Sequence, residues 1–268
     1  MGDDLRVVGD LPSLTRRRLL LTGAAGVLTL AVASERLGAL GLPRGLAEVG
    51  RRPERLEPPP RRRWTETVIG ESRQGRPMLV YQNVVSNPRA SVVAIAALHG
   101  NERGIAPAAM GFTNTVVPDG VNAFVLPIAN PDGWAANQRR NANGVDLNRN
   151  FPVQWRRNVI SGPSPASEPE TRAMMDLVDG IRPTVTVWMH EMLRYVAHVS
   201  PAAVPYAEAW ARPISYPTRS VFQYGGGESW TGRVLGLPSV LVEGESFEAT
   251  VSDLVTHRLG FDELLTVL

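Results

Sequence analysis

Short strand-like apolar runs alternate with helix-like segments along most of this chain, and this alternation restricts the fold more than any other feature. We expect strands at residues 91–98, 121–128, 183–189 and 239–242. We expect helices at residues 105–117, 167–180, 204–210, 229–235 and 252–268. Chains that alternate in this way form parallel or mixed sheets covered by helices. The sequence therefore predicts an α/β fold, with a mixed, largely parallel twisted sheet and helices on both faces.

Three further segments punctuate this pattern. Residues 65–83 have the composition of a hairpin, with two strand-like runs joined by a polar turn. The Asn-Pro-Asp-Gly sequence at residues 130–133 is a turn signal. Residues 134–166 lack periodicity, and a loop of this length in a compact domain usually carries a function. Ser167 is expected to cap the helix that follows this loop.

The front of the chain has the pattern of an export signal. Three consecutive arginines at residues 16–18 precede an apolar run, which ends in the small residues Ala31-Val32-Ala33. The paired arginines resemble a twin-arginine signal. The run has about 15 residues, fewer than the ~20 that span a bilayer as a helix, and an uncleaved anchor is the alternative. We predict a signal at residues 1–33, a Pro- and Arg-rich linker at residues 34–63, one folded domain at residues 64–268, and a location outside the cytoplasm.

Charge and cysteine content exclude several classes of protein. The formal net charge is +2, and the basic excess lies in the first 63 residues, so the domain itself is slightly acidic. A nucleic-acid partner is therefore not expected. The chain has no Cys, which excludes disulfides, thiolate metal sites and a Cys nucleophile. We expect a monomer with no stable membrane span after signal removal.

Two residues with metal-binding side chains follow the first buried strand. His99 and Glu102 lie three residues apart and could close on one ion from a tight turn. Catalytic zinc sites combine three protein ligands with an open position. His190 is the third candidate, because it follows the strand predicted at residues 183–189; His198 is the alternative, although it lies beyond that strand. A His-x-x-Glu pair alone is a weak signal, which a hydrogen-bonded turn histidine would also explain.

The long loop offers donors for an anionic group. Asn148 and Arg149 lie side by side, and an arginine makes bidentate contacts with carboxylates. A second arginine of the loop could stabilise negative charge that develops on a carbonyl oxygen. A solvated polar loop is the alternative interpretation.

Glu243 follows the strand predicted at residues 239–242. An unpaired carboxylate is costly at the end of a buried strand. A structural ion pair would explain this residue, and so would a general base beside a metal. Glu245 takes this role if the strand register is shifted by two residues.

Several motifs occur in one order over roughly residues 65–245. They are His99-Gly-Asn-Glu102, Asn130-Pro-Asp-Gly133, Gly144-Val-Asp-Leu-Asn-Arg-Asn-Phe151, His190 after a strand, Gly226-Gly-Glu-Ser-Trp230, and Glu243. Together they resemble the zinc carboxypeptidase family of carboxypeptidase A. The resemblance is closest to its small bacterial members of the murein peptide amidase A type.

The resemblance implies one zinc ion held by His99, Glu102 and His190. It also implies that Asn148 and Arg149 hold the terminal carboxylate of a peptide or muropeptide substrate.

The remaining roles follow from the same resemblance. Arg139 would polarise the scissile carbonyl, with Arg140 as the alternative. Glu243 would take a proton from water and later deliver it to the leaving amine. Glu228 lies where the family lines the pocket for the residue after the cut, and a carboxylate there would favour a cationic group. An exposed loop glutamate is the alternative.

The family's mobile tyrosine has no clear counterpart, since Val221 lies about where it is expected and Tyr224 is close by. The leading hypothesis is an exported zinc metallocarboxypeptidase or peptide amidase that cleaves an amide bond next to a substrate carboxylate. Its substrates would be peptides with basic C-termini or cell-wall peptides with γ-D-Glu-diaminopimelate. The alternatives are a zinc deacylase of the aspartoacylase or succinylglutamate desuccinylase type and a non-catalytic peptide- or wall-binding protein.

Overall fold

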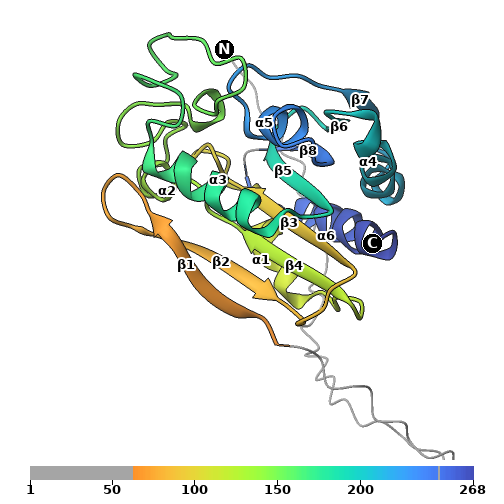
Figure 1. Cartoon of the computed structure of the whole chain (residues 1–268). Helices are drawn as coiled ribbons and strands as arrows, with labels where there is room; N and C mark the ends of the chain where they lie inside the picture. The colour runs from red at the N-terminus through yellow and green to blue at the C-terminus, as the bar shows by residue number, and fades with distance from the viewer. Residues whose placement is uncertain (1–62, 247) are drawn as a thin grey trace, which may run out of the picture. The chain divides into compact units, whose positions relative to one another are not determined.

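A mixed sheet of eight strands forms the centre of the computed structural model, which describes residues 63–246 and 248–268 (Figure 1). Its strands are β1 (Thr65–Glu71), β2 (Pro77–Asn83), β3 (Ala90–Ala96), β4 (Val121–Leu126), β5 (Val185–Glu191), β6 (Tyr195–His198), β7 (Thr218–Ser220) and β8 (Ser239–Gly244). The predicted export signal at residues 1–33 and all of the predicted linker except Arg63 lie outside the described residues.

Helices connect most of these strands. They are α1 (Ile105–Gly111), α2 (Pro131–Ala136), α3 (Pro169–Ile181), α4 (Val204–Ala211), α5 (Gly227–Arg233) and α6 (Val251–Thr266). Short 3-10 turns occur at η2 (Phe112–Asn114), η3 (Leu147–Arg149), η4 (Pro201–Ala203) and η5 (Arg212–Ile214). Within the described residues, no helix combines the length and the apolarity needed to cross a bilayer.

The strands lie in the order β1-β2-β4-β3-β5-β8-β6-β7. The four central strands β4, β3, β5 and β8 run parallel to one another. The hairpin β1–β2 joins one side of this group antiparallel, and β6 joins the other side antiparallel. The prediction of a mixed, largely parallel α/β sheet is therefore confirmed. The carboxyl ends of the central strands meet at one edge, where ligands bind in sheets of this kind.

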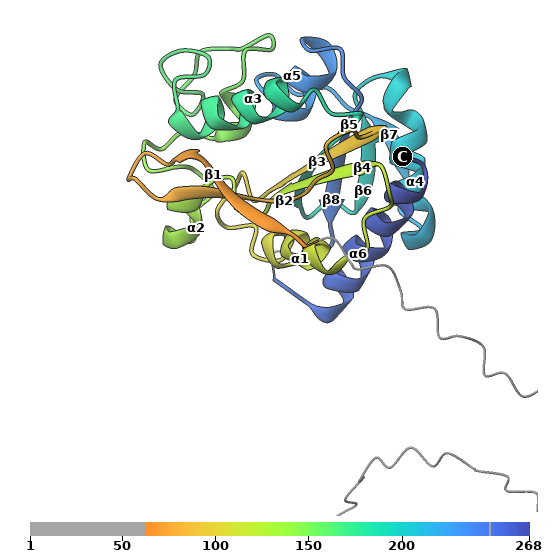
Figure 2. The same ribbon diagram turned by 60° about the horizontal axis from the view of Figure 1, so that its bottom comes forward.

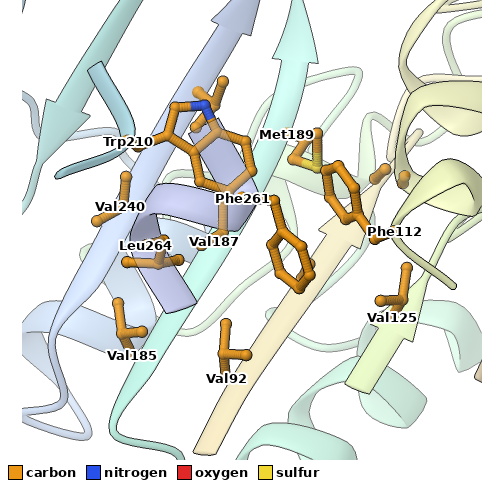
Figure 3. Close-up of a cluster of buried hydrophobic side chains, with 14 of the residues drawn as sticks. Val92, Phe112, Val125, Val185, Val187, Met189, Trp210, Val240, Phe261 and Leu264 are labelled. Atoms are coloured by element: carbon orange, nitrogen blue, oxygen red, sulfur yellow. The ribbon is translucent and has the colours of Figure 1, made fainter. Parts of the chain in front are cut away.

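Helices cover both faces of the sheet, as Figure 2 shows, with α3 and α5 on one face and α1 and α6 on the other. Side chains of β3 alternate between the two apolar clusters, with Val92 and Ala94 in one and Val93 and Ile95 in the other. Figure 3 shows the cluster on the α6 face. There Phe261 stacks on Phe112, with the two ring centroids 4.2 Å apart. Because both faces are buried, the central strands are mostly apolar, and their polar residues lie at or near the strand ends.

The two ends of the loop region differ from the sequence-based expectations. Residues 130–133 do not form a simple turn but begin helix α2. The Asn130 side chain accepts a hydrogen bond from the Gly133 amide at 2.9 Å, and Pro131 takes the first helical position. The predicted Ser167 cap is also wrong, because Glu168 is the N-cap of α3 and Ser167 donates a hydrogen bond to its carboxylate at 2.7 Å.

Some strand boundaries also differ. β5 continues through Glu191, so His190 lies within the strand and not after it. β6 and β7 were not expected from the sequence. They have four and three residues, too few for an alternating pattern to be distinguished from a loop.

Candidate metal centre and active site

Two neighbouring parallel strands bring the three predicted metal ligands together. In the pairing of β3 with β5, Ala96 lies opposite Met189. His190 is the next residue of β5, while His99 and Glu102 lie in the turn just beyond the end of β3. The Glu102 amide donates to the His99 carbonyl at 3.2 Å, which closes this turn. The fold therefore places all three side chains at the carboxyl edge of the sheet.

The three side chains converge on one point. His99 Nδ1 lies 2.6 Å from Glu102 Oε1, and His190 Nδ1 lies 3.3 Å from Glu102 Oε2. The two imidazole Nδ1 atoms are 3.2 Å apart. All three residues are at most 3% exposed. Within the described residues this is the one group of three such side chains with ligand atoms within 4.8 Å of one another.

This donor set fits a divalent zinc ion. Burial alone would lower the pKa of His99, but the carboxylates of Glu102 and Asp146 outweigh it and raise that pKa to about 9. Burial alone would raise the pKa of Glu102, but His190 and His99 lower it to about 2. Two ring nitrogens and a carboxylate that converge in this way can share one positive ion. Zinc accepts both imidazole nitrogen and carboxylate oxygen, so it fits this set.

Asp146 completes the environment of His99, a role that could not be predicted from the sequence. Its Oδ1 lies 3.1 Å from His99 Nε2, and Arg139 Nε donates to its Oδ2 at 3.0 Å. Burial opposes ionisation of this carboxyl, but the hydrogen bond and charge of His99 hold its pKa well below its usual range. A carboxylate on the far nitrogen of a ligating histidine fixes the orientation of the ring. Its only signal in the sequence was its place in the long loop, two residues before Asn148.

All eight predicted site residues line one cavity of about 220 Å³. The predicted ligands His99, Glu102 and His190 form one part of its wall, together with Glu243. The other predicted residues in the wall are Arg139, Asn148, Arg149 and Glu228. Their roles remain predictions, but their common location is what those roles require.

The loop pair Asn148 and Arg149 is oriented by a 3-10 turn. Asp146 caps this turn and accepts from the Asn148 amide at 3.0 Å. Asn148 Oδ1 accepts from the Gly227 amide at 2.9 Å, which ties the loop to the start of α5. Arg149 donates to the Asn148 carbonyl at 2.8 Å and makes no ion pair with any described residue. Its guanidinium therefore remains available for an anionic ligand.

The two arginines that the sequence left as alternatives lie in different places. Arg139 lines the cavity of the metal centre. Arg140 lines a separate cavity together with Asp132 and Gln138. Arg139 is thus the one that could face a substrate carbonyl.

The two glutamates at the end of β8, Glu243 and Glu245, also lie in different environments. Glu243 pairs in register with His190, is 8% exposed and lines the cavity. Its Oε2 has no hydrogen-bond partner among the described residues. Burial raises the pKa of Glu243, with Glu102 adding to the rise and His190 opposing it. Glu245 lies outside this cavity and forms an ion pair with Arg194 at 3.0 Å.

Glu228 is not an exposed loop residue. It lies in the first turn of α5 and is fully buried. Ser229 donates to its Oε1 at 3.2 Å, while its Oε2 has no partner within the described part of the chain. Burial raises the pKa of this carboxyl. A buried acceptor that faces a cavity without a donor is suited to bind a cationic or hydrogen-bonding ligand.

Tyr195 is the tyrosine in the wall of this cavity, and the sequence analysis missed it. Of the two positions that the sequence suggested for a tyrosine, Val221 lines the cavity and Tyr224 does not. Tyr195 is 6% exposed and lies on the unexpected strand β6, with the Arg219 guanidinium 3.3 Å from its ring centroid. Burial raises its phenol pKa. No local pattern could have identified it, because its position depends on the antiparallel pairing of β6 with β8.

Gly100 is required at the turn that holds His99 and Glu102. A Cβ atom at this residue would overlap the backbone of Gly133, at the start of α2. We expect Gly100→Ala to lower the free energy of unfolding by about 2–3 kcal/mol, because one of the two backbones must move. Urea unfolding measures this change.

Gly111 provides the matched control for this prediction. It has helical dihedral angles, and a Cβ there would meet no atom within 4 Å. Gly111→Ala should leave stability unchanged or raise it by about 0.5 kcal/mol, since alanine restricts the unfolded chain. Equal stability of the Gly100→Ala and Gly111→Ala proteins would contradict the close approach at Gly100.

Comparison with known proteins relates this arrangement to a described family. The family model for zinc carboxypeptidase matches residues 61–209. Murein peptide amidase A of Escherichia coli strain K12 is 32% identical over 141 residues, which cover 46% of this chain and 58% of that protein. Carboxypeptidase SOL1 of Arabidopsis thaliana is 27% identical over 156 residues, covering 56% of this chain and 26% of that protein. The chain thus spans less than two thirds of the length of these relatives.

Solved structures show the same fold. The murein-tripeptide amidase of Escherichia coli O157 superposes with a TM-score of 0.65 at 25% identity, covering 78% of this chain and 92% of that chain. Carboxypeptidase A of Helicoverpa armigera superposes with a TM-score of 0.64 at 19% identity, covering 77% of this chain and 67% of that chain. In the second case the likeness concerns the fold alone.

Proposed function

The chain belongs to the zinc carboxypeptidase family, and on this premise we propose that it hydrolyses an amide bond next to a carboxylate of a peptide substrate. The observation that carries this proposal is the convergence of His99, Glu102 and His190 in one cavity with Glu243. A binding protein on this fold would not need a carboxylate with a free oxygen beside these three residues. The similarity to murein peptide amidases supports cell-wall peptides as the substrate class.

His99, Glu102 and His190 would hold one zinc ion. A bound zinc ion supplies a Lewis acid that polarises a carbonyl and activates water as a nucleophile. Asp146 would keep His99 oriented through its hydrogen bond to Nε2. The ligand nitrogen of each ring would then be Nδ1, which is the atom that faces the other ligands in each case.

Glu243 would move the proton. Its free Oε2 can accept a proton from the attacking water, and the burial that raises its pKa makes it a better base than an exposed carboxylate. The same oxygen can then deliver the proton to the amine that leaves. Arg139 lies in the same wall and would donate hydrogen bonds to the carbonyl oxygen as negative charge develops there.

Three further residues of the cavity wall would select the residue after the cut. Asn148 and Arg149 would hold its terminal carboxylate, since an arginine without a carboxylate partner makes strong bidentate contacts. Glu228 would face its side chain. A fully buried carboxyl with a free oxygen favours a cationic group, such as the ammonium of lysine or of diaminopimelate.

Glu228→Gln tests this selectivity. The change keeps the size of the side chain and removes its charge. We expect kcat/KM for peptides with a basic last residue to fall roughly 10–100-fold, which corresponds to the loss of one charged hydrogen bond. The values for peptides with an apolar last residue should stay the same or rise.

Glu208→Gln is the control for this measurement, because Glu208 is an exposed residue of α4 on the other face of the sheet. It should change neither value. An apolar preference in the unmodified protein would contradict the role of Glu228 while leaving the hydrolytic reaction intact.

A substrate panel tests the function itself. The zinc-loaded protein is incubated with peptides ending in basic, acidic and apolar residues, with a γ-D-glutamyl-diaminopimelate muropeptide and with N-acyl amino acids. Mass spectrometry should detect release of the last residue from peptides or muropeptides. Release of acyl groups from N-acyl amino acids alone would favour the zinc deacylase alternative, and binding without any hydrolysis would favour the binding-protein alternative.

An exported location is also part of the proposal. It is supported by the arginine pair at residues 16–17 and the apolar run that follows. An export signal matches a substrate class that lies outside the cytoplasm. Fractionation of cells that express the full chain tests it, since a cytoplasmic protein would contradict the signal.

A further inference from the structure

A second cavity adjoins the metal centre on the side of Arg149. It has a volume of about 170 Å³ and is lined by Arg149, Arg156, Asn158, Gln223 and Tyr224. Arg149 and Gln223 also line the cavity of the metal centre, so the two cavities share these two residues in their walls. The second cavity has two guanidinium groups in its wall and no acidic residue. It is therefore a site of positive charge directly beside the proposed clamp for the terminal carboxylate.

Arg156 is held in place without an anionic partner. Its guanidinium carbon lies 3.4 Å from the centroid of the Tyr224 ring, and this ring packs at right angles on Phe222 at 5.1 Å. Stacking uses the flat face of a guanidinium and leaves its N–H donors at the edge free. Neither Arg149 nor Arg156 forms an ion pair within the part of the chain that the structure describes.

We propose that this second cavity, with Arg156 as its main donor, binds a second carboxylate of the leaving residue. The inference rests on the proposed function, in which Asn148 and Arg149 hold the first carboxylate. Arg149 lines both cavities, so a ligand with two carboxylates could place one in each of them. A side chain that ends in a carboxylate is the simplest source of the second group.

The combination with Glu228 narrows the chemistry of that side chain. Glu228 offers a negative charge at the metal cavity, and Arg156 offers a positive charge at the adjoining one. A leaving residue whose side chain carries both an ammonium and a carboxylate matches both charges. Diaminopimelate has this chemistry, whereas lysine has the ammonium alone and glutamate has the carboxylate alone. The second cavity would thus distinguish diaminopimelate from lysine, which Glu228 alone cannot do.

The test compares substrates that differ by one carboxylate. The zinc-loaded protein is assayed with three γ-D-glutamyl peptides, ending in lysine, in diaminopimelate and in lysyl-D-alanine. We expect the unmodified protein to prefer diaminopimelate over lysine by roughly tenfold in kcat/KM, the effect of one exposed charge-assisted hydrogen bond. Arg156→Gln should remove this preference and leave the lysine peptide unchanged.

Arg157→Gln is the matched control, because Arg157 is the next residue and lines a different cavity. It should leave all three values unchanged. If Arg156→Gln lowers kcat/KM only for the lysyl-D-alanine peptide, Arg156 binds the main-chain carboxylate of D-alanine, and the assignment to a side-chain carboxylate is overturned. An equal loss on all three peptides, or no loss, would overturn the inference, since Arg156 would then act through the packing of Tyr224 or not at all.

Binding of the free amino acids separates this inference from the proposed function. Calorimetry with diaminopimelate and lysine measures the cavity without any hydrolysis. If diaminopimelate binds more tightly than lysine and Arg156→Gln abolishes the difference, the second site stands even if no peptide is cleaved. If peptides are cleaved and no measurement depends on Arg156, the hydrolytic function stands and the second site is rejected.

Discussion

Glu243→Gln should lower kcat for peptide hydrolysis by about 10²–10⁴-fold while the protein keeps one zinc ion. Glutamine has the size of glutamate but cannot accept the proton from water at neutral pH. The change occurs at the only carboxylate that pairs in register with His190 on the neighbouring strand. It does not alter His99, Glu102 or His190, so metal content should persist.

Two measurements check this result together. Steady-state kinetics with the peptide that the substrate panel identifies gives kcat, and atomic emission spectroscopy gives zinc per chain. Glu245→Gln is the control, because Glu245 lies two residues further along the chain and forms an ion pair with Arg194 at 3.0 Å. It should retain nearly full activity. Full activity of the Glu243→Gln protein would reject Glu243 as the base, and collapse of the Glu245→Gln protein would move the role to that residue.

His190→Ala should remove bound zinc and abolish turnover. His190 is one of the three predicted ligands, and its Nδ1 lies 3.2 Å from the Nδ1 of His99. Loss of residues that merely orient a ligand lowers metal affinity about 10–100-fold, so loss of the ligand itself should lower it by more. Competition against a chromophoric chelator measures this affinity, and excess zinc should restore little activity.

His198→Ala is the control, since His198 was the sequence-based alternative for the third ligand. It follows Val196 by two residues on β6, and Val196 belongs to the apolar cluster on the opposite face of the sheet. Its side chain therefore lies on the wrong face to reach His99. The His198→Ala protein should bind zinc normally. Stoichiometric, tight zinc in the His190→Ala protein would contradict the whole metal centre.

The convergence of His99, Glu102 and His190 could be predicted from the sequence because their placement follows from local rules. Each lies at or just beyond the end of a buried apolar strand, and parallel strands bring such ends to one edge. The spacing of His99 and Glu102 within one turn needs no information from distant residues. The same reasoning found Glu243, whose strand is a direct neighbour of the strand that carries His190.

The roles of residues inside the long loop could be predicted only in part from the sequence. Its many Asn and Arg residues indicated an anion-binding role. The sequence could not show which of two adjacent arginines lines the active-site cavity. Arg139 and Arg140 point to different cavities because the loop is held by distant contacts, such as the hydrogen bond from Arg139 to Asp146. A loop has no regular periodicity, so its sequence does not show the direction of its side chains.

The sequence by itself determined the α/β class, the strand ends that carry the ligands, and the set of side chains able to hold a metal and a carboxylate. Only the tertiary structure decided that Asp146 supports His99, that Tyr195 lines the cavity, that Glu228 is buried, and that Arg156 opens a second cavity beside Arg149. The physical reason is the range of the forces involved. Strand and helix preferences act over a few residues, whereas burial and cavity shape depend on which distant segments pack together.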